Sequence, residues 1–370
     1  MTIPAFDLKR QTTVIANDVL LSIQRVLDSS QFILGNTVKD FEETIGRYIG
    51  ASAIGVANGS DALYLALLAL NIGRGDEVIT TPFTFFATAG SILRTGAKPV
   101  FSDIQLDTFN MDPDLASAHV TPRTRAMLPV HLFGLMADLP QLAAHFDGPI
   151  VEDAAQAIGA SWNHRAAGTA GILGCFSFFP TKNLGAYGDA GLVSSRNPEL
   201  LQQVRHLRVH GSSKKYVHEM LGINSRLDAM QAAVLSVKLP YLPAWTRRRQ
   251  AIATLYDSLF RHQGIEEVTV PVVPSEAVHV YHQYTIRAMR RDDLMSFLKQ
   301  RGIGSTVYYP VPLHLQPILK DLGYRRGDFP VSEKASEEVL SLPMFPELTD
   351  DEVTRVVDTI GEFYGHSPRR

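Results

Sequence analysis

Short apolar runs alternate with segments of helical periodicity through most of the chain. The runs that predict strands are residues 54–57, 77–80, 99–101, 126–130 and 149–152. Between them, apolar residues recur at helical spacing over residues 61–70, 85–93 and 139–145. Two earlier segments, residues 14–27 and a stretch with Phe41, Ile45 and Tyr48, have the same spacing and predict a helical N-terminal arm. This alternation predicts an α/β fold, with a mostly parallel sheet covered by helices on both faces. Ligands of such sheets bind beyond the carboxyl ends of the strands.

The pattern changes at Pro240 and Pro243, which interrupt the regular alternation. An Arg-rich helix over residues 243–262 follows, then a strand at 284–289 and helices at 292–301 and 350–364. We therefore predict a large domain over residues 1–242 and a smaller C-terminal α/β domain over residues 243–370. A chain of 370 residues is longer than one hydrophobic core usually serves, which agrees with this division.

The composition is that of an ordinary globular protein, with 45% hydrophobic and 20% charged residues. A net charge of −3 and the lack of a long basic run give no support to binding of nucleic acid or of a membrane surface. No apolar run reaches the roughly 18 residues of a membrane helix, and the N-terminus does not resemble a signal peptide. The single cysteine, Cys175, is consistent with a reducing compartment. We expect a cytoplasmic protein without a metal site.

A lysine follows one of the apolar runs. Residues 176–179 lead to Lys182, on a turn that contains Gly185, Gly188 and Gly191. The ordinary interpretation of a lone lysine on a loop is a solvated side chain. The alternative is a nucleophilic amine that forms a Schiff base with an aldehyde cofactor.

Polar residues also follow two other predicted strands. Asp153 either caps the next helix or pairs with a ring nitrogen and keeps that nitrogen protonated. Asn58, Gly59, Ser60 and Asp61 open a helix, and they form either an N-cap or a cup for a phosphate group. A lysine, a carboxylate and a phosphate cup are the fixed points that pyridoxal 5′-phosphate (PLP) needs, which favours the functional interpretation of all three.

Two further residues depend on that interpretation. Phe85 follows the strand at 77–80 and is either a core residue or an aromatic ring that lies flat on a cofactor ring. Ser177 lies five residues before Lys182, so its hydroxyl would reach the phosphate that Lys182 faces.

Several loops are candidates for substrate contacts. We expect Phe32 and Ile33 to plug the edge of the core, with contact to a substrate as the alternative. Residues 206–216 are rich in His, Arg and Lys and predict an exposed basic loop. The segment 308–314 has two tyrosines and a histidine among prolines, which is typical of a stiff binding loop or of a packed domain edge.

Several polar residues precede the helix predicted over residues 229–239. Ser225 is a candidate cap for this helix. Asn224 and Arg226 are suited to contacts with phosphate or sugar groups.

Taken together, these motifs resemble the DegT/DnrJ/EryC1/StrS family of PLP-dependent aminotransferases. The segments that carry the resemblance are residues 58–63, 84–88, 152–156, 177–185 and 224–228, in this order and at these spacings. The resemblance extends from about Phe6 to the final helix. It implies the aspartate aminotransferase-like fold type I of PLP-dependent transferases and an enzyme that acts on nucleotide-linked keto sugars.

The resemblance also implies roles for individual residues. Lys182 would form the Schiff base and act as acid and base, Asp153 would bind the pyridine nitrogen, and Gln156 would contact the phenolic oxygen. Phe85 and Ala155 would lie against the two faces of the ring. The phosphate would be held by Gly59, Ser60, Asp61 and Ser177, and by Asn224 of a neighbouring subunit, which implies a homodimer with shared active sites. The implied candidates for substrate contacts are Phe32, Tyr187, Arg226, Tyr308, Tyr309 and His314.

The residue at position 182 separates two branches of the family. Relatives with histidine there act as dehydratases, so Lys182 favours transamination. Residues 224–228 and 307–314 look more like those of members acting on dTDP- or UDP-linked 3-keto sugars. L-Glutamate is the expected amino donor in a ping-pong reaction. The alternatives are a 4-keto sugar aminotransferase, a non-enzymatic PLP-binding regulator or sensor, and a PLP enzyme for dehydration or for a small amino acid.

Overall fold

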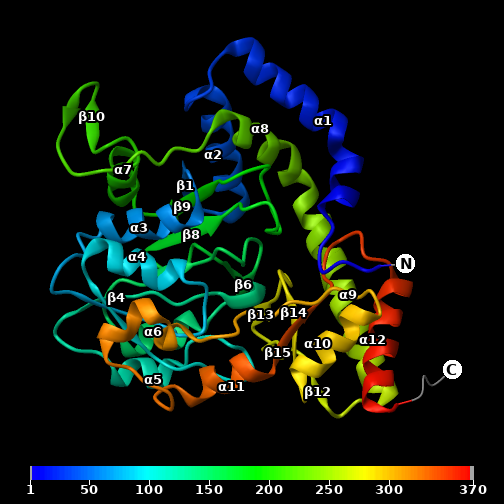
Figure 1. The fold of residues 1–370 in the computed structure, drawn as a ribbon. Coiled ribbons are helices and arrows are strands. Elements are labelled where there is room, and N and C mark those ends of the chain that lie inside the picture. Colours follow the sequence, from blue (N-terminus) through cyan, green and yellow to red (C-terminus); the bar gives the residue numbers. More distant parts are fainter. Residues whose placement is uncertain (1, 367–370) are drawn as a thin grey trace.

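The computed structural model describes residues 2–366 and has a central sheet covered by helices (Figure 1). Its strands lie in the order β1 (Ser52–Val56), β9 (Gly191–Ser195), β8 (Leu173–Ser177), β5 (Val151–Asp153), β4 (Thr124–Met127), β2 (Glu77–Thr80) and β3 (Lys98–Phe101). Parallel bridges from Met127 to Ile150 and from Val130 to Asp153 connect the β4 side to the β5 side. Among the described strands of this sheet, β9 alone runs against the others, so the predicted mostly parallel sheet is confirmed.

Helices pack on both faces of this sheet. One face is covered by α2 (Gly35–Ile49), α5 (Pro113–Ala118), α6 (Leu139–His145) and α8 (Ala229–Lys238), and the other by α3 (Gly59–Ala69), α4 (Ala87–Thr95) and α7 (Pro198–Leu207). Successive residues of a strand point to opposite faces, so a strand covered on both sides is mostly apolar. On β8, Cys175 packs with the second group of helices, whereas Phe176 packs with the first.

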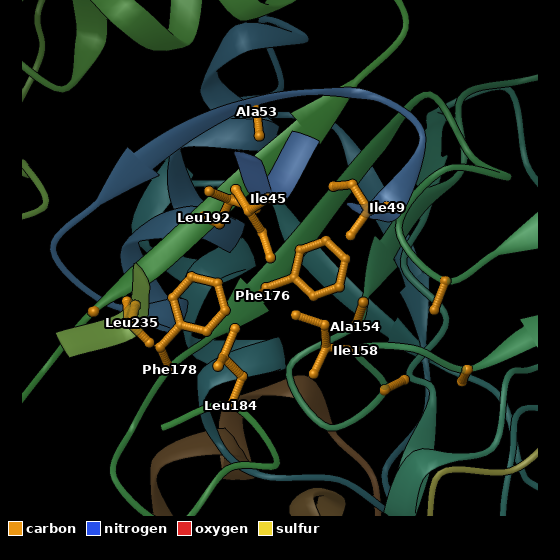
Figure 2. Close-up of a cluster of buried hydrophobic side chains, with 14 of the residues drawn as sticks. Ile45, Ile49, Ala53, Ala154, Ile158, Phe176, Phe178, Leu184, Leu192 and Leu235 are labelled. Carbon is orange, nitrogen blue, oxygen red and sulfur yellow. The ribbon is translucent and has the colours of Figure 1, made fainter. Parts of the chain in front are cut away.

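Figure 2 shows the core between the sheet and the first group of helices. Phe176 and Phe178, at the end of β8, lie there with Leu192 of β9 and Ile45 of α2. Phe178 also meets the edge of Phe41, with ring centroids 5.8 Å apart. Full burial of each of these side chains contributes about 1.5–3 kcal/mol. This packing immobilises the end of β8, from which the chain continues to Lys182.

The C-terminal part has a core of its own. Strand β14 (Tyr284–Ala288) pairs with β12 (Val268–Thr269) and β15 (Val339–Leu342), and α9 (Leu242–Gln263), α10 (Arg291–Gln300) and α12 (Asp350–Tyr364) pack against them. These elements match the helices and the strand predicted from the sequence. The division at residues 242 and 243 stays a prediction.

The N-terminal segment joins this C-terminal core. Ile3 is 1% exposed within it, and its backbone pairs with that of Ile303. Arg10 donates to both carboxylate oxygens of Glu352, at 2.8 and 2.7 Å. Thr349 and Glu352 also form the capping box that starts α12. From this anchor, α1 (Leu8–Ser29) runs along α8 (Figure 1).

The structure also bears on membrane insertion. No helix within residues 2–366 has both the length and the apolar character needed to cross a membrane.

The prediction of an exposed basic loop over residues 206–216 is wrong in its first part. His206 lies in α7, and Arg208 is 5% exposed because its guanidinium donates to Glu42 of α2 at 2.5 Å and to the carbonyl of Gly55 at 2.6 Å. The rest is a hairpin of β10 (Ser212–Lys214) and β11 (Val217–His218), which projects from the body of the molecule in Figure 1. The remaining elements are β6 (Ser161–Trp162), β7 (Arg165–Ala166), β13 (Ala277–Val278), α11 (Pro330–Glu338) and the short 3₁₀ helices Leu132–Gly134, Leu239–Tyr241, Leu313–Leu315 and Pro317–Leu322.

Candidate active site

The parallel strands bring the predicted site residues to one edge of the sheet. Asp153 ends β5, Ser177 ends β8, and Gly59 starts α3 just after β1. Lys182 follows β8, and its backbone N–H donates to the carbonyl of Phe179 at 2.8 Å, which closes a tight turn. Because β1, β5 and β8 run in the same direction, their carboxyl ends lie together, as expected for a ligand site of an α/β sheet.

Lys182 is shielded enough for its basicity to change. Burial lowers the pKa of Lys182 to about 8, and the nearby carboxylate of Asp153 opposes this shift. An amine with this pKa is about one tenth unprotonated at pH 7 and about half unprotonated at pH 8, whereas an ordinary lysine is almost fully protonated at both. A lysine that is both nucleophilic and able to exchange a proton near neutral pH is therefore available at this edge.

Asp153 is 5% exposed and held by two hydrogen bonds. The Thr88 hydroxyl donates to its Oδ2 at 2.8 Å, and the N–H of Ala155 donates to its Oδ1 at 3.2 Å. Burial raises the pKa of Asp153, while these donors and the positive charge of Lys182 act in the opposite direction. A cationic group placed against the carboxylate would favour its charged form, as a protonated pyridine nitrogen does. Thr88 belongs to a motif quoted from the sequence, but nothing there showed that it holds Asp153.

The start of α3 and the end of β8 together form a cup. At position 59 of this cup there is room only for glycine. A Cβ atom on Gly59 would lie 2.7 Å from Cβ and 3.2 Å from Oγ of Ser177. Asn58 caps the helix by accepting from the N–H of Asp61 at 2.8 Å. The predicted N-cap and the phosphate cup thus coexist, and the N–H of Asp61 is already engaged by the cap. The N–H groups of Gly59 and Ser60, with the hydroxyl of Ser177, are the donors this cup offers to a phosphate.

A polar and aromatic wall stands beside these groups. Gln156 accepts from the N–H of Phe133 at 2.7 Å and donates to the Tyr309 hydroxyl at 3.2 Å. The ring centroids of Tyr309 and Phe85 are 6.3 Å apart. The Phe85 residue is 60% exposed. An exposed phenylalanine at the carboxyl edge is not a core residue, so the structure excludes the core interpretation of Phe85. The link between Gln156 and Tyr309 joins two residues 153 positions apart and has no signal in the sequence.

The loop before α2 corrects one prediction. Phe32 and Ile33 are 45% and 52% exposed, so they do not plug the core. The carbonyl of Phe32 instead accepts from the N–H of Ala229 at 3.1 Å, which places this loop at the start of α8. Contact with a substrate, the alternative interpretation, stays a prediction for Phe32.

Ser225 is likewise not the cap of α8. Asp228 occupies the N-cap position, and the buried Ser225 hydroxyl accepts from the N–H of Ala57 at 3.1 Å, beside the phosphate cup. Its neighbours Asn224 and Arg226 are exposed and half-buried, respectively. Their predicted contacts with phosphate and sugar stay predictions.

The other candidate substrate residues differ in accessibility. Tyr187 is 39% exposed on the loop that follows Lys182, and Tyr308 packs edge-on against Tyr309 at 5.8 Å between ring centroids. His314 is only 1% exposed, and its Nε2 lies 2.9 Å from Oε1 of Glu333. The structure therefore brings Tyr187, Tyr308 and Tyr309 to accessible or adjoining positions, but it does not bring His314 to a surface.

A buried pair behind Asp153 was missed by sequence reasoning. The carboxylate of Glu152 lies 2.7 Å from Nε2 of His131 and accepts from the N–H groups of Gly168, Ala170 and Gly171. Nδ1 of His131 accepts from the N–H of Ala137, so the ring proton of the neutral imidazole lies on Nε2, toward Glu152. Glu152 thereby fixes the strand end that carries Asp153.

Comparison with known proteins agrees with this geometry. The model of the DegT/DnrJ/EryC1/StrS aminotransferase family matches residues 14–361. The chain is 51% identical to a pleiotropic regulatory protein of Geobacillus stearothermophilus, over 99% of this chain and 100% of that protein. It is 43% identical to a UDP-N-acetyl-3-dehydro-alpha-D-glucosamine 3-aminotransferase of Acidithiobacillus ferrooxidans, over 97% of each chain.

A solved structure supports the same conclusion. The crystal structure of DesV from S. venezuelae in complex with a ketimine intermediate superimposes with a TM-score of 0.96, at 42% identity and over 99% of both chains. The predicted fold type I of PLP-dependent transferases is thus confirmed, and the lysine, the buried carboxylate and the glycine-lined cup fit that cofactor. On these grounds the chain belongs to the DegT/DnrJ/EryC1/StrS aminotransferase family.

Proposed function

We propose that this protein is a PLP-dependent aminotransferase that transfers an amino group from L-glutamate to a nucleotide-linked 3-keto sugar. The observation that carries the proposal is the combination, at one sheet edge, of Lys182 with its lowered pKa, the buried Asp153 and the cup at Gly59. The 3-keto position is supported by the relative from A. ferrooxidans, which is named as a 3-aminotransferase.

Different residues of the site would have different roles in such a reaction. Bound PLP supplies an electron sink for the carbon from which a proton is removed. Lys182 holds and moves that proton, and its pKa of about 8 lets it act as a base and then as an acid near neutral pH. Asp153 provides the negative charge that keeps a ring nitrogen protonated, and Thr88 fixes its orientation. Gln156, held by Phe133 and Tyr309, would contact the bound PLP through its amide.

The remaining parts of the proposal concern partners. A homodimer with shared active sites is supported by the exposed position of Asn224, which leaves its amide available to a second subunit. We assign the nucleotide sugar to the accessible side of the site, where Tyr187, Tyr308 and Arg226 are candidate contacts. The single buried thiol, Cys175, is consistent with a cytoplasmic location.

The test is an absorbance spectrum of the PLP-loaded protein before and after addition of L-glutamate alone. In a ping-pong transaminase, the donor discharges its amino group without the sugar, so the band of bound PLP should disappear and 2-oxoglutarate should form in equal amount. Lys182→Ala serves as the control and should not turn over. Panels of 3-keto and 4-keto nucleotide sugars then identify the acceptor.

A regulator that binds PLP without transferring amino groups is the second candidate, because the relative from G. stearothermophilus is named as a pleiotropic regulatory protein. The same experiment separates the two functions. A PLP band that neither L-glutamate nor other amino donors change would contradict the transaminase and favour the regulator.

A further inference from the structure

Lys238 is a buried lysine whose contacts lie on the loop of the proposed site. It ends α8, is 1% exposed, and donates from Nζ to the carbonyl of Gly185 at 2.6 Å. The same ammonium lies 4.7 Å from the centroid of the Tyr187 ring. Within residues 2–366 it forms no ion pair with a carboxylate, so these two contacts, together with the more distant charge of Glu347, compensate its burial.

Both contacts of Lys238 are with the loop that follows Lys182. This loop folds tightly back on itself, because a Cβ atom on Gly185 would lie 2.2 Å from the carbonyl oxygen of Pro180. The N–H of Ala186 donates to the carbonyl of Phe178 at 2.8 Å, which secures its inner side to the end of β8. The outer side is secured by α8.

A second residue of α8 holds the same loop. Gln231 lies seven residues before Lys238, so the two side chains project from one face of the helix, two turns apart. The side-chain oxygen of Gln231 accepts from the N–H of Tyr187 at 2.8 Å. The Tyr187 hydroxyl in turn donates to Thr12 of α1 at 3.2 Å. The loop is thus clamped between the end of β8 and the face of α8.

We propose that Lys238 is a positioning residue that acts through the Gly185 carbonyl and the Tyr187 ring to hold Lys182 in place beside Asp153. The inference depends on Lys182 being the reactive amine of the proposed function. The clamp limits the access of water to Lys182, and it also holds the candidate substrate contact Tyr187 in place.

The basicity of Lys182 reports its position directly. Desolvation lowers its pKa to about 8, Asp153 on β5 raises it, and the neighbouring His282 ahead of β14 is close enough to interact with its charge. Lys238 has a pKa of about 8 for the same reason, opposed by Glu347. If the loop loosens, Lys182 gains water and its pKa should rise toward the ordinary value of about 10.4.

The experiment measures that pKa in the apoprotein, by trace labelling with acetic anhydride across a pH series and peptide mass spectrometry. Lys238→Met removes the ammonium but keeps the side-chain length, and it should raise the pKa of Lys182 by about one unit. Lys238→Arg should restore much of the wild-type value. Gln231→Met, at a half-buried position, should give a smaller shift in the same direction. Lys39→Met, at a lysine whose side chain is 71% exposed, is the matched control and should give none.

Kinetics and stability complete the test. With the PLP-loaded enzyme, Lys238→Met should lower kcat about tenfold and leave the KM for L-glutamate within about threefold, as expected for a misplaced catalytic group. An unshifted pKa of Lys182 in both Lys238→Met and Gln231→Met would overturn the inference, even if both variants melt at a lower temperature. If Lys238→Met does not fold, Gln231→Met decides alone. A wild-type protein without transaminase activity would refute the proposed function, but the labelling result would still decide whether Lys238 positions Lys182.

Discussion

Gly59→Ala is the sharpest test of the phosphate cup. The added Cβ would lie 2.7 Å from Cβ of Ser177, whereas two carbon atoms in contact are normally about 3.5–4.0 Å apart. Either Ser177 or the start of α3 must therefore move by about 1 Å. Ser177 ends a strand whose neighbours are packed, so we expect the helix start to move and to carry the N–H groups of Gly59 and Ser60 away from the phosphate.

The magnitude follows from the cost of overpacking, about 1–3 kcal/mol, which corresponds to an affinity for PLP about 5- to 150-fold weaker. The assay is an absorbance titration of the apoprotein with PLP. Thermal unfolding of the apoprotein should change less, because alanine is the better helix former and offsets part of the strain.

Two controls isolate the steric effect. Gly73→Ala introduces the same methyl group where the nearest atom is 3.7 Å away, and PLP affinity should not change. In a double-mutant cycle with Ser177→Gly, the two changes should be non-additive, because glycine at 177 removes the atoms that clash. PLP affinity within twofold of wild type in Gly59→Ala, or additive losses in the cycle, would refute the assignment of the cup.

Other predictions concern charge and stability. The folded pKa of Lys182, about 8, lies below its unfolded value of about 10.4, so the unfolded chain binds more protons between these values. Apoprotein stability in urea should therefore gain a contribution as the pH rises through this window and lose it as the pH falls, and Lys182→Met should remove that contribution. Arg208→Met leaves Glu42 buried without its cation and should lower the free energy of unfolding by about 3–5 kcal/mol, against less than about 1 kcal/mol for Arg301→Met at an exposed ion pair. Glu152→Gln cannot accept all four hydrogen bonds of the carboxylate and should cost about 2–3 kcal/mol, whereas an unchanged urea midpoint would contradict the assigned network.

The sequence predicted those parts of the molecule that depend on local pattern. Strand β2 was located at residues 77–80, where all four side chains are buried. The direction of parallel strands then placed Asp153 and Lys182 at a shared edge, although neither residue is near Gly59 in the chain. Such inferences succeed because strand periodicity and strand direction are properties of short segments.

The rest depends on contacts between distant segments, which leave no local signal. Arg208 seemed solvated because its neighbours are basic, but its partner Glu42 lies 166 positions away. Phe32 seemed a core residue because it is large and apolar, yet its loop rests on the start of α8 and leaves the ring exposed. Strand β9 went unrecognised as the strand that reverses direction between β1 and β8.

The anchoring of Ile3 has a consequence for how the chain is made. The ribosome synthesises Ile3 long before its packing partners in β14, β15 and α12. N-terminal parts of proteins generally begin to fold during synthesis, and contacts between distant residues form slowly. Here the segment around Ile3 has no packing partners in this core until β14, β15 and α12 have been translated. The C-terminal core can therefore be completed only when α12 has been made, and a segment synthesised early reaches its final place late.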